Sequence, residues 1–212
     1  MSTDRGPIEV ILFDLGNVIL PFNHYQIAEK LSRYTANPSY RDPQRIFSYL
    51  FDFEHGAIND YEKGRITTDR FFNALKEELQ LGLSFEEFAP IWNDIFWEDV
   101  EVSETIRALK GRKRLGLVSN TNPLHFDYIL SKFPVVRELE RWILSHEVGW
   151  KKPAKEIFQR AIEWAGVEPG RILFIDDMKT HVEAAISMGM KGIHFLSSDQ
   201  LRKELSGMLD RG

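Results

Sequence analysis

The chain has 212 residues, which is enough for one domain of ordinary size with an inserted module. Hydrophobic residues make up 43% of the chain and charged residues 28%, a balance that excludes global disorder. A formal net charge of −5 argues against a general nucleic-acid or membrane-surface binding protein. Because the chain contains no cysteine, a disulfide scaffold, a thiolate zinc site and a cysteine nucleophile are excluded.

The N-terminal segment shows no signal-peptide pattern. Residues 1–7 are polar, and the apolar run that follows, residues 8–22, is interrupted by Glu9, Asp14 and Asn17, so it does not predict a membrane span. We therefore expect a soluble, cytoplasmic protein with no nucleic-acid or membrane partner. We also expect frayed chain ends, over residues 1–7 and after Leu209. The sequence does not indicate the oligomeric state.

Apolar runs and helical patterns alternate in much of the chain. Runs at residues 10–13, 115–118 and 172–175 are continuous, as is typical of strands buried on both faces of a parallel sheet. Weaker strand candidates lie at 142–145 and 192–196. Apolar residues at helical spacing predict helices over 122–132, 155–165 and 179–188. This alternation predicts an α/β fold with a parallel sheet, in which reactive groups gather at the carboxyl ends of the strands.

Residues 21–100 form a block of a different kind. They show helical patterns over 25–34, 43–53, 68–79 and 85–96, and no convincing strand. Thr67 and Ser84 are predicted helix N-caps. We therefore expect two domains: a core made of residues 1–20 and 101–212, and a helical insert, residues 21–100. Because the insert follows the first strand, it is well placed to act as a lid.

Carboxylates follow two of the predicted strands. Asp14 comes directly after the first strand and is a candidate nucleophile or metal ligand, although a turn aspartate is an equally good interpretation of it alone. Asp176 and Asp177 follow another strand, where two adjacent carboxylates repel one another unless a positive charge lies between them. Together the three carboxylates indicate a Mg²⁺ site.

Two further segments carry groups suited to a phosphate. Ser119 and Asn120 precede a predicted helix, whose N-terminus favours anions, although ordinary helix capping uses the same residue types. Lys151 and Lys152 precede Pro153 and the next helix. One of these lysines is able to neutralise a phosphate, although such lysines are more often simply solvated.

The order of these segments resembles that of the haloacid dehalogenase superfamily. Residues 13–18 (FDLGNV) resemble its first motif, and the second, third and fourth motifs resemble residues 118–120 (VSN), 152–153 (KP) and 174–177 (FIDD). Residues 61–67 (YEKGRIT) are similar to the sugar-phosphatase branch, particularly to glucose-1-phosphate phosphatase-like members. The resemblance implies a Rossmann-like core with a helical cap inserted after the first strand.

The resemblance also implies a Mg²⁺-dependent phosphatase that forms an aspartyl-phosphate on a small phosphorylated metabolite. It assigns attack on phosphorus to Asp14 and charge neutralisation to Lys152, with Ser119 and the Asn120 backbone holding the transferring oxygens. It assigns the metal to three groups, the Asp14 carboxylate, the Gly16 carbonyl and Asp177, with Asp176 as a further or outer ligand. Phosphoryl transfer needs mainly positioning and charge neutralisation, so this division of labour is physically reasonable.

The pattern departs from the superfamily at Gly16. Phosphatases of the superfamily usually carry a second aspartate there, which serves as general acid and base, and such a loss typically costs ~10²–10⁴-fold in rate. Either the substrate has a leaving group of low basicity, such as a sugar anomeric phosphate, or another side chain substitutes; His24, Glu54 and His55 are candidates.

Gly16 also leaves two other functions open. The dehalogenase branch lacks the second aspartate as well, and a metal-independent 2-haloacid dehalogenase is one alternative, although adjacent Asp176 and Asp177 disfavour an anionic haloacid. A catalytically silent phosphometabolite-binding module is the other. Sequence alone does not identify the substrate.

Overall fold

The computed structural model describes residues 6–52 and 54–209. Five parallel strands form one sheet, in the order β3-β2-β1-β4-β5. The strands are β1 (Val10–Phe13), β2 (Arg114–Ser119), β3 (Arg141–Leu144), β4 (Ile172–Asp176) and β5 (Lys191–His194). This is a Rossmann-like strand order, and the predicted α/β fold is confirmed. Most of the chain ends that were expected to fray, residues 1–5 and 210–212, lie outside the described residues.

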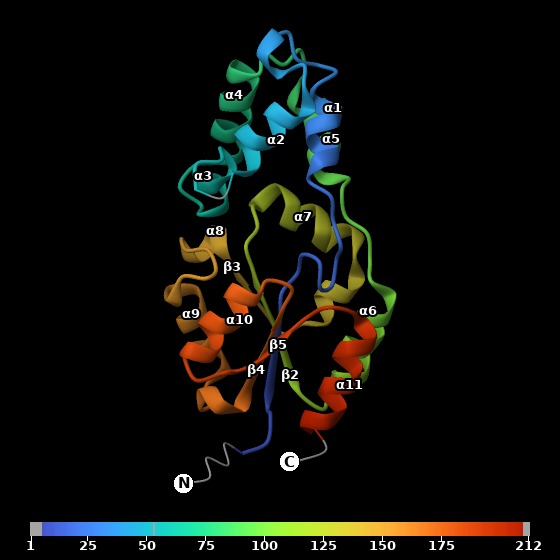
Figure 1. The fold of residues 1–212 in the computed structure, drawn as a ribbon, viewed down its shortest axis with the longest axis vertical. Coiled ribbons are helices and arrows are strands. Elements are labelled where there is room, and N and C mark those ends of the chain that lie inside the picture. The colour runs from blue at the N-terminus through green and yellow to red at the C-terminus, as the bar shows by residue number, and fades with distance from the viewer. Residues whose placement is uncertain (1–5, 53, 210–212) are drawn as a thin grey trace.

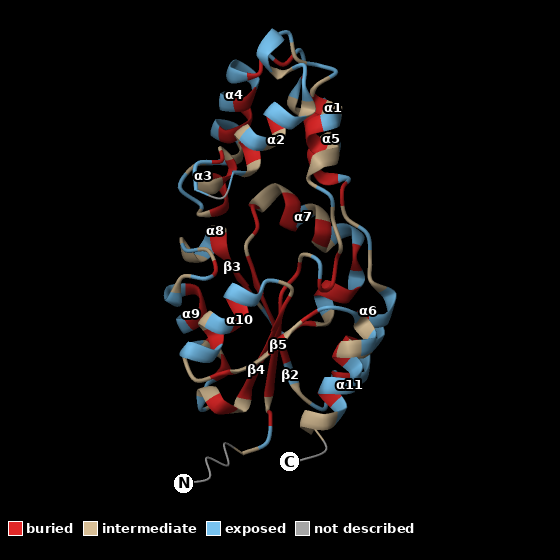
Figure 2. Ribbon diagram, viewed as in Figure 1, coloured by how far each residue is buried: buried red, intermediate tan, exposed pale blue. Residues whose placement is uncertain are grey.

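Helices cover both faces of the sheet (Figure 1). Every residue of β1 is buried, because alternate side chains enter two hydrophobic clusters on opposite faces. One cluster joins the sheet to α6 (Val100–Leu109), α7 (Pro123–Lys132) and α11 (Ser198–Leu209). The other joins it to α9 (Lys155–Ala165) and α10 (Lys179–Ser187). The three central strands are almost continuously buried: all of β1 and β4, and β2 after its first residue (Figure 2).

The helices between residues 21 and 100 form a separate layer beyond the carboxyl edge of the sheet (Figure 1). They are α1 (Tyr25–Leu31), α2 (Pro43–Phe51), α3 (Ile58–Glu62), α4 (Thr68–Glu78) and α5 (Phe85–Asn93). We call this layer the cap. It has its own hydrophobic cluster, whose largest fully buried side chains include Trp92, Tyr61, Phe71 and Phe88. The exact domain boundaries, 1–20, 21–100 and 101–212, stay a prediction.

Helix ends follow local capping chemistry. The Thr67 hydroxyl accepts from the backbone of Arg70, and Ser84 forms a capping box with Glu87, which confirms both predicted N-caps. Gly166 ends α9 in the left-handed conformation, with φ of 63°.

Several predicted bounds were wrong. The helix expected over 85–96 ends at Asn93, because the residues that follow leave the helix and pair with the chain entering the cap: the Asn23 N–H donates to the Ile95 carbonyl, and the Trp97 N–H to the Pro21 carbonyl. The strand expected over 142–145 ends at Leu144, where the short helix α8 (Ser145–Val148) begins. Short 3₁₀ segments lie at Pro38–Tyr40, Pro134–Glu138 and Pro169–Arg171. Within the described residues, no helix is both long and apolar enough to cross a membrane.

Candidate active site

The side chains of Asp14, Asp176 and Asp177 lie at the point where the strand order of the sheet reverses. β2 pairs with β1 on one side and β4 pairs with it on the other, so the strand order reverses at β1, and ligands of such sheets bind at the carboxyl ends of the strands on either side of this point. Asp14 follows β1, and its N–H donates to the Ile175 carbonyl at 2.8 Å. Asp176 ends β4 and Asp177 follows it. Pairing of β1 with β4 therefore brings Asp14 to Asp176 and Asp177, which are 162 and 163 residues away in the sequence.

Lys152 joins two of these carboxylates. Its Nζ atom lies 2.7 Å from Asp14 Oδ1 and 2.6 Å from Asp176 Oδ2, and only 2% of the residue is exposed. The segment that carries Lys152 is held by the side chain of Asn120. Asn120 Oδ1 accepts from the Lys152 N–H at 2.7 Å, and Asn120 Nδ2 donates to the Lys152 carbonyl at 3.0 Å. The Asn120 side chain thus fixes the lysine, a role that the sequence analysis missed.

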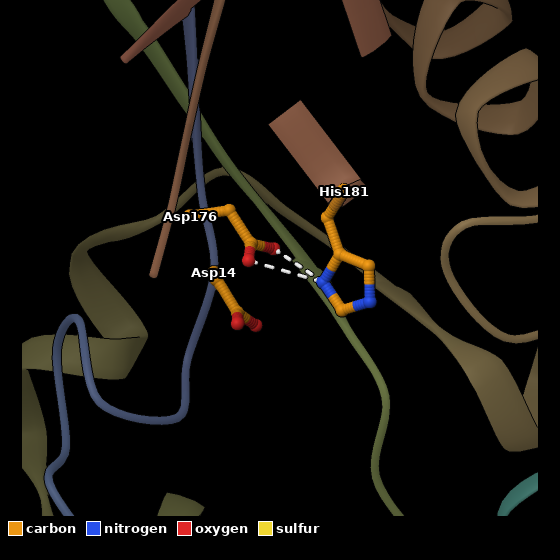
Figure 3. A group of neighbouring side chains, drawn as sticks. All are labelled: Asp14, Asp176 and His181. Carbon is orange, nitrogen blue, oxygen red and sulfur yellow. Dashed lines mark hydrogen bonds and ion pairs between the residues drawn. The ribbon is translucent and has the colours of Figure 1, made fainter. Parts of the chain in front are cut away.

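Asp176 is bound by three donors. Its Oδ1 accepts from the Met178 N–H at 2.8 Å, and its Oδ2 accepts from Lys152. The Nδ1 atom of His181, on α10, lies 3.0 Å from Oδ1 and 3.1 Å from Oδ2 (Figure 3). His181 was missed by the sequence analysis, although its place in the first turn of a helix predicted directly after Asp177 was a usable signal.

Asp177 is bound less completely. Its Oδ2 accepts from Asn17 Nδ2 at 3.2 Å, and the residue is partly exposed. Asn17 adopts a left-handed backbone conformation, with φ of 55°, which asparagine tolerates better than most residues. This conformation at the end of the FDLGNV segment brings the Asn17 amide to Asp177.

Burial and neighbouring charges have opposing effects on the pKa values of Asp14, Asp176 and Lys152. Burial raises the pKa of Asp14 to about 8, helped by the neighbouring Asp176 and Asp177 carboxylates and opposed by Lys152. Burial also acts to raise the pKa of Asp176, but Lys152 and His181 outweigh it and lower this pKa to about 2. Burial acts to lower the pKa of Lys152, but Asp14 and Asp176 raise it above its usual value. Lys152 and Asp176 therefore form an ion pair, whereas burial of Asp14 and its two neighbouring carboxylates outweigh Lys152 and favour the neutral form of Asp14.

A divalent cation fits this charge distribution. Three carboxylates face a single ammonium group, and hard oxygen ligands suit Mg²⁺. Asp14, Asp176 and His181 offer ligand atoms within 4.8 Å of one another. However, Lys152 already lies between the two carboxylates of that set, so a cation at its centre would meet the ammonium group. Asp177, which has the weaker set of donors, is the better partner of Asp14.

Gly16 is covered by an aromatic ring. A Cβ atom built on Gly16 would lie 2.6 Å from Cε1 of Phe22, too close for any side chain while the ring stays in place. The Phe22 ring in turn contacts His24, with a centroid separation of 4.4 Å. The space that a side chain at position 16 would need is therefore filled by an apolar group.

The structure separates the three candidates for a substitute acid. The side chains of Glu54 and His55 are 77% and 87% exposed, and their closest charged contact is with each other. His24 is more buried and stacks on Phe51 at 4.2 Å. Burial, helped by the nearby charge of Lys151, lowers the pKa of His24 to about 3, so its ring is neutral. Of the three, His24 alone belongs to the buried region beside Phe22.

The cap is closed over this edge of the core through α3. Glu62 forms an ion pair with Lys151, and Lys151 Nζ also donates to Asn59 Oδ1 at 2.9 Å. The Leu124 N–H, at the start of α7, donates to the Tyr61 hydroxyl at 3.2 Å. Just past α3, Gly64 (φ of 64°) passes so close to the His146 carbonyl that a side chain there would overlap it. The cap thereby touches the lysine segment and the helix that follows Ser119.

Ser119 ends β2 at the same edge and is 2% exposed. Among the described residues, no side-chain hydrogen bond is formed by its hydroxyl, whereas the next residues are bound: the Thr121 N–H donates to Ser145 Oγ at 2.9 Å. The Ser119 hydroxyl is thus available to a ligand. Asp14, Ser119, Lys152, Asp176 and Asp177 thus lie at one edge of the sheet, whereas the candidate acids Glu54 and His55 lie exposed in the cap.

Comparison with known families agrees with this geometry. A family model of haloacid dehalogenase-like hydrolases matches residues 8–189, most of the chain. The chain belongs to this family. Its five-stranded parallel sheet with helices on both faces is the fold of this family.

Relatives of this hydrolase include phosphatases. The D-ribitol-5-phosphate phosphatase of Bacteroides thetaiotaomicron is 27% identical over 96% of the chain and 99% of its own length. Flavin mononucleotide hydrolase 1 of Arabidopsis thaliana is 35% identical over 74% of the chain and 60% of its own length. A solved haloacid dehalogenase family enzyme from Bacteroides thetaiotaomicron, in complex with magnesium and inorganic phosphate, superposes with a TM-score of 0.76, at 25% identity over 88% of the chain and 93% of that enzyme.

Proposed function

We propose that this hydrolase is a Mg²⁺-dependent phosphatase that cleaves a small phosphorylated metabolite, a sugar phosphate, through an aspartyl-phosphate on Asp14. The observation that carries the proposal is the buried Lys152 ammonium group between Asp14 and Asp176, with Asp177 beside them. This arrangement concentrates charge where a phosphoryl group would be transferred. Two relatives named for the hydrolysis of phosphate esters support it.

Each residue has a part in this proposal. An Asp14 oxygen attacks phosphorus, the bond to the leaving oxygen breaks, and water then releases phosphate from Asp14. Ser119 Oγ and the Asn120 N–H bind the transferring oxygens, and Lys152 offsets their charge. The Asn120 side chain meanwhile keeps Lys152 in place through its two hydrogen bonds.

The metal is held by Asp14, the Gly16 carbonyl and Asp177, with Asp176 outside the inner set. When bound, Mg²⁺ supplies the positive charge that keeps Asp14 ionised and neutralises phosphate oxygens. The raised pKa of Asp14 supports this need for a cation. Asn17 holds Asp177 in position through its hydrogen bond of 3.2 Å.

The Phe22 ring over Gly16 bears on the class of leaving group. No acidic side chain has room at position 16 while this ring is in place. A phosphate ester whose leaving oxygen has low basicity needs less help from a general acid. We therefore favour anomeric sugar phosphates, in keeping with the glucose-1-phosphate phosphatase-like branch, over esters of ordinary alcohols.

The two alternatives remain distinct in their chemistry. A 2-haloacid dehalogenase needs no metal and must bind a carboxylate substrate, which the three carboxylates of this site disfavour. A silent binding module would bind phosphate esters without turnover. The near-complete set of motif residues at one edge of the sheet favours a working hydrolase.

Phosphate release from a panel of sugar, sugar-alcohol and aryl phosphates tests the proposal, with Mg²⁺ and with chelator. Metal-dependent release that falls steeply as the leaving group becomes more basic is the expected result. Release that is independent of leaving-group basicity would reject the preference for anomeric sugar phosphates but would still support a phosphatase. No release, combined with halide release from a 2-haloacid without metal, would favour the dehalogenase.

A further inference from the structure

We propose that His181 is a positioning residue for this reaction: by donating its Nδ1–H to Asp176, it commits that carboxylate to Lys152 and leaves the metal to Asp177. The proposal deepens the proposed phosphatase function and rests on it for its kinetic effect. His181 lies in the first turn of α10 and is 4% exposed. It enters the site from outside the segments that carry the other functional groups (Figure 3).

Both carboxylate oxygens of Asp176 already accept hydrogen bonds from the protein. An ionised carboxylate has about four acceptor positions, two on each oxygen. Three donors already use most of them: the Met178 N–H binds Oδ1 at 2.8 Å, Lys152 Nζ binds Oδ2 at 2.6 Å, and the single Nδ1–H of His181 is shared between Oδ1 at 3.0 Å and Oδ2 at 3.1 Å. Asp176 therefore has less free capacity for a metal ion than Asp177, whose side chain accepts from Asn17 at 3.2 Å.

The contact with Asp176 determines which ring nitrogen of a neutral His181 carries the proton. The Asp176 carboxylate only accepts hydrogen bonds, so the proton of a neutral His181 ring is on Nδ1. This tautomer leaves Nε2 without a proton. Since the carboxylate is held on both oxygens by one ring atom, it has little freedom to rotate about its side-chain bond.

His181 is connected to Asp14, the proposed nucleophile, through Asp176 and Lys152. Asp176 Oδ2 and Asp14 Oδ1 hold the Lys152 ammonium between them, at 2.6 and 2.7 Å. His181, Asp176, Lys152 and Asp14 therefore form one chain of hydrogen bonds inside the protein. If His181 is removed, Asp176 keeps only Met178 and Lys152 as donors, so its carboxylate holds Lys152 less firmly where the lysine offsets charge on Asp14 and the phosphoryl group.

The test compares His181→Ala with His181→Asn. An asparagine amide is able to donate from nearly the same place as Nδ1, whereas alanine is not. Loss of such an outer partner typically costs ~10–100-fold. We expect kcat of His181→Ala to fall by about this factor, with KM and Mn²⁺ affinity changing by less than about threefold, and His181→Asn to recover most of the loss. Val182→Ala, a buried change on the same helix that is 5% exposed, is the matched control for α10 stability and should keep kcat.

Three outcomes would overturn the proposal. If His181→Ala loses Mn²⁺ binding by tenfold or more, as measured by calorimetry without substrate, His181 or the Asp176 that it holds contributes to metal binding, and the metal is not left to Asp177. If kcat is unchanged, His181 does not position the site. A long-range proton–nitrogen NMR spectrum of the wild-type protein tests the tautomer without any turnover: a proton on Nε2 in place of Nδ1 would reject the donation to Asp176. This readout separates failure of the proposal from failure of the phosphatase function, which the wild-type assay alone decides.

Discussion

The Nζ atom of Lys152 lies 2.7 Å from Oδ1 of Asp14, and both side chains are almost completely removed from solvent. Lys152 favours the ionised form of Asp14 against the effect of burial, and loss of the lysine would leave a buried carboxylate without this partner. The contact joins the loop before α9 to the end of β1, so it depends on the fold of the entire core. It is the central feature of the proposed catalytic site.

We expect Lys152→Met to lower kcat by at least ~10²-fold, because one preorganised positive charge at the transferring group is lost. The same change should destabilise the protein, because two buried carboxylates lose their partner. Lys155→Met, which removes an exposed lysine at the start of α9, is the matched control and should retain activity. Phosphate release with near wild-type kcat in Lys152→Met would contradict this role.

The fit of Phe22 over Gly16 predicts a compensating pair of substitutions. Gly16→Ala should destabilise the protein by about 1–3 kcal/mol, because its Cβ atom would lie 2.6 Å from the Phe22 ring. Phe22→Leu in the same chain should recover part of that cost by making room. Urea denaturation of the single and double variants measures the coupling. Additive effects of the two substitutions would show that the ring does not limit position 16.

The ion pair between Glu62 and Lys151 should contribute more to stability than a surface pair. Its side chains are 11% and 19% exposed, whereas those of the pair Arg160–Glu163 are 66% and 50% exposed. A double-mutant cycle with Glu62→Gln and Lys151→Met should give a coupling free energy above the ~0.2–1 kcal/mol typical of exposed pairs. The cycle with Arg160→Met and Glu163→Gln, the matched control, should stay within that range. Equal coupling in both cycles would show that cap closure does not depend on this contact.

Acid should weaken the protein through His125. Asn122 Nδ2 donates to His125 Nδ1 at 3.1 Å, and His125 Nε2–H donates to the Trp92 carbonyl of the cap at 2.9 Å, so the ring is neutral. Burial lowers its pKa to about 4. Below pH ~6.5 the unfolded chain therefore binds a proton that the folded chain does not, and the free energy of unfolding should fall between pH ~6.5 and 4.

The contribution of His125 to this fall is about 3 kcal/mol, from the difference between the two pKa values. His125→Gln should make the free energy of unfolding less dependent on pH in that range, as measured by urea denaturation at a series of pH values. His55→Gln, which removes an exposed histidine, is the control. An unchanged pH dependence in His125→Gln would contradict the assignment.

The sequence predicted the sheet well because its strands are buried on both faces. Continuous apolar runs such as residues 10–13 and 172–175 have few other interpretations, and both lie within strands of the sheet. The helices α3, α6, α8 and α11 were not predicted. The cap helix α3 has only five residues, too few to show a period, and its position depends on contacts of Tyr61 and Glu62 with the core.

The site was predicted at the level of motifs but not of contacts. Asp14, Ser119, Lys152 and Asp176 each follow or precede a recognisable element, so their common edge was predictable. Nothing in the local sequence around Asn120 indicates that its side chain binds the backbone of Lys152, 32 residues away. The filling of the space at Gly16 by Phe22 depends likewise on the path of the chain into the cap.

The most direct test of the central proposal is acid quenching of the protein during turnover of a sugar phosphate with Mg²⁺, followed by peptide mass spectrometry. We expect a phosphoryl group on Asp14, absent in Asp14→Asn and absent when chelator is present. Active phosphate release with no phosphoryl group on Asp14, or with Asp14→Asn still active, would contradict covalent catalysis by this residue.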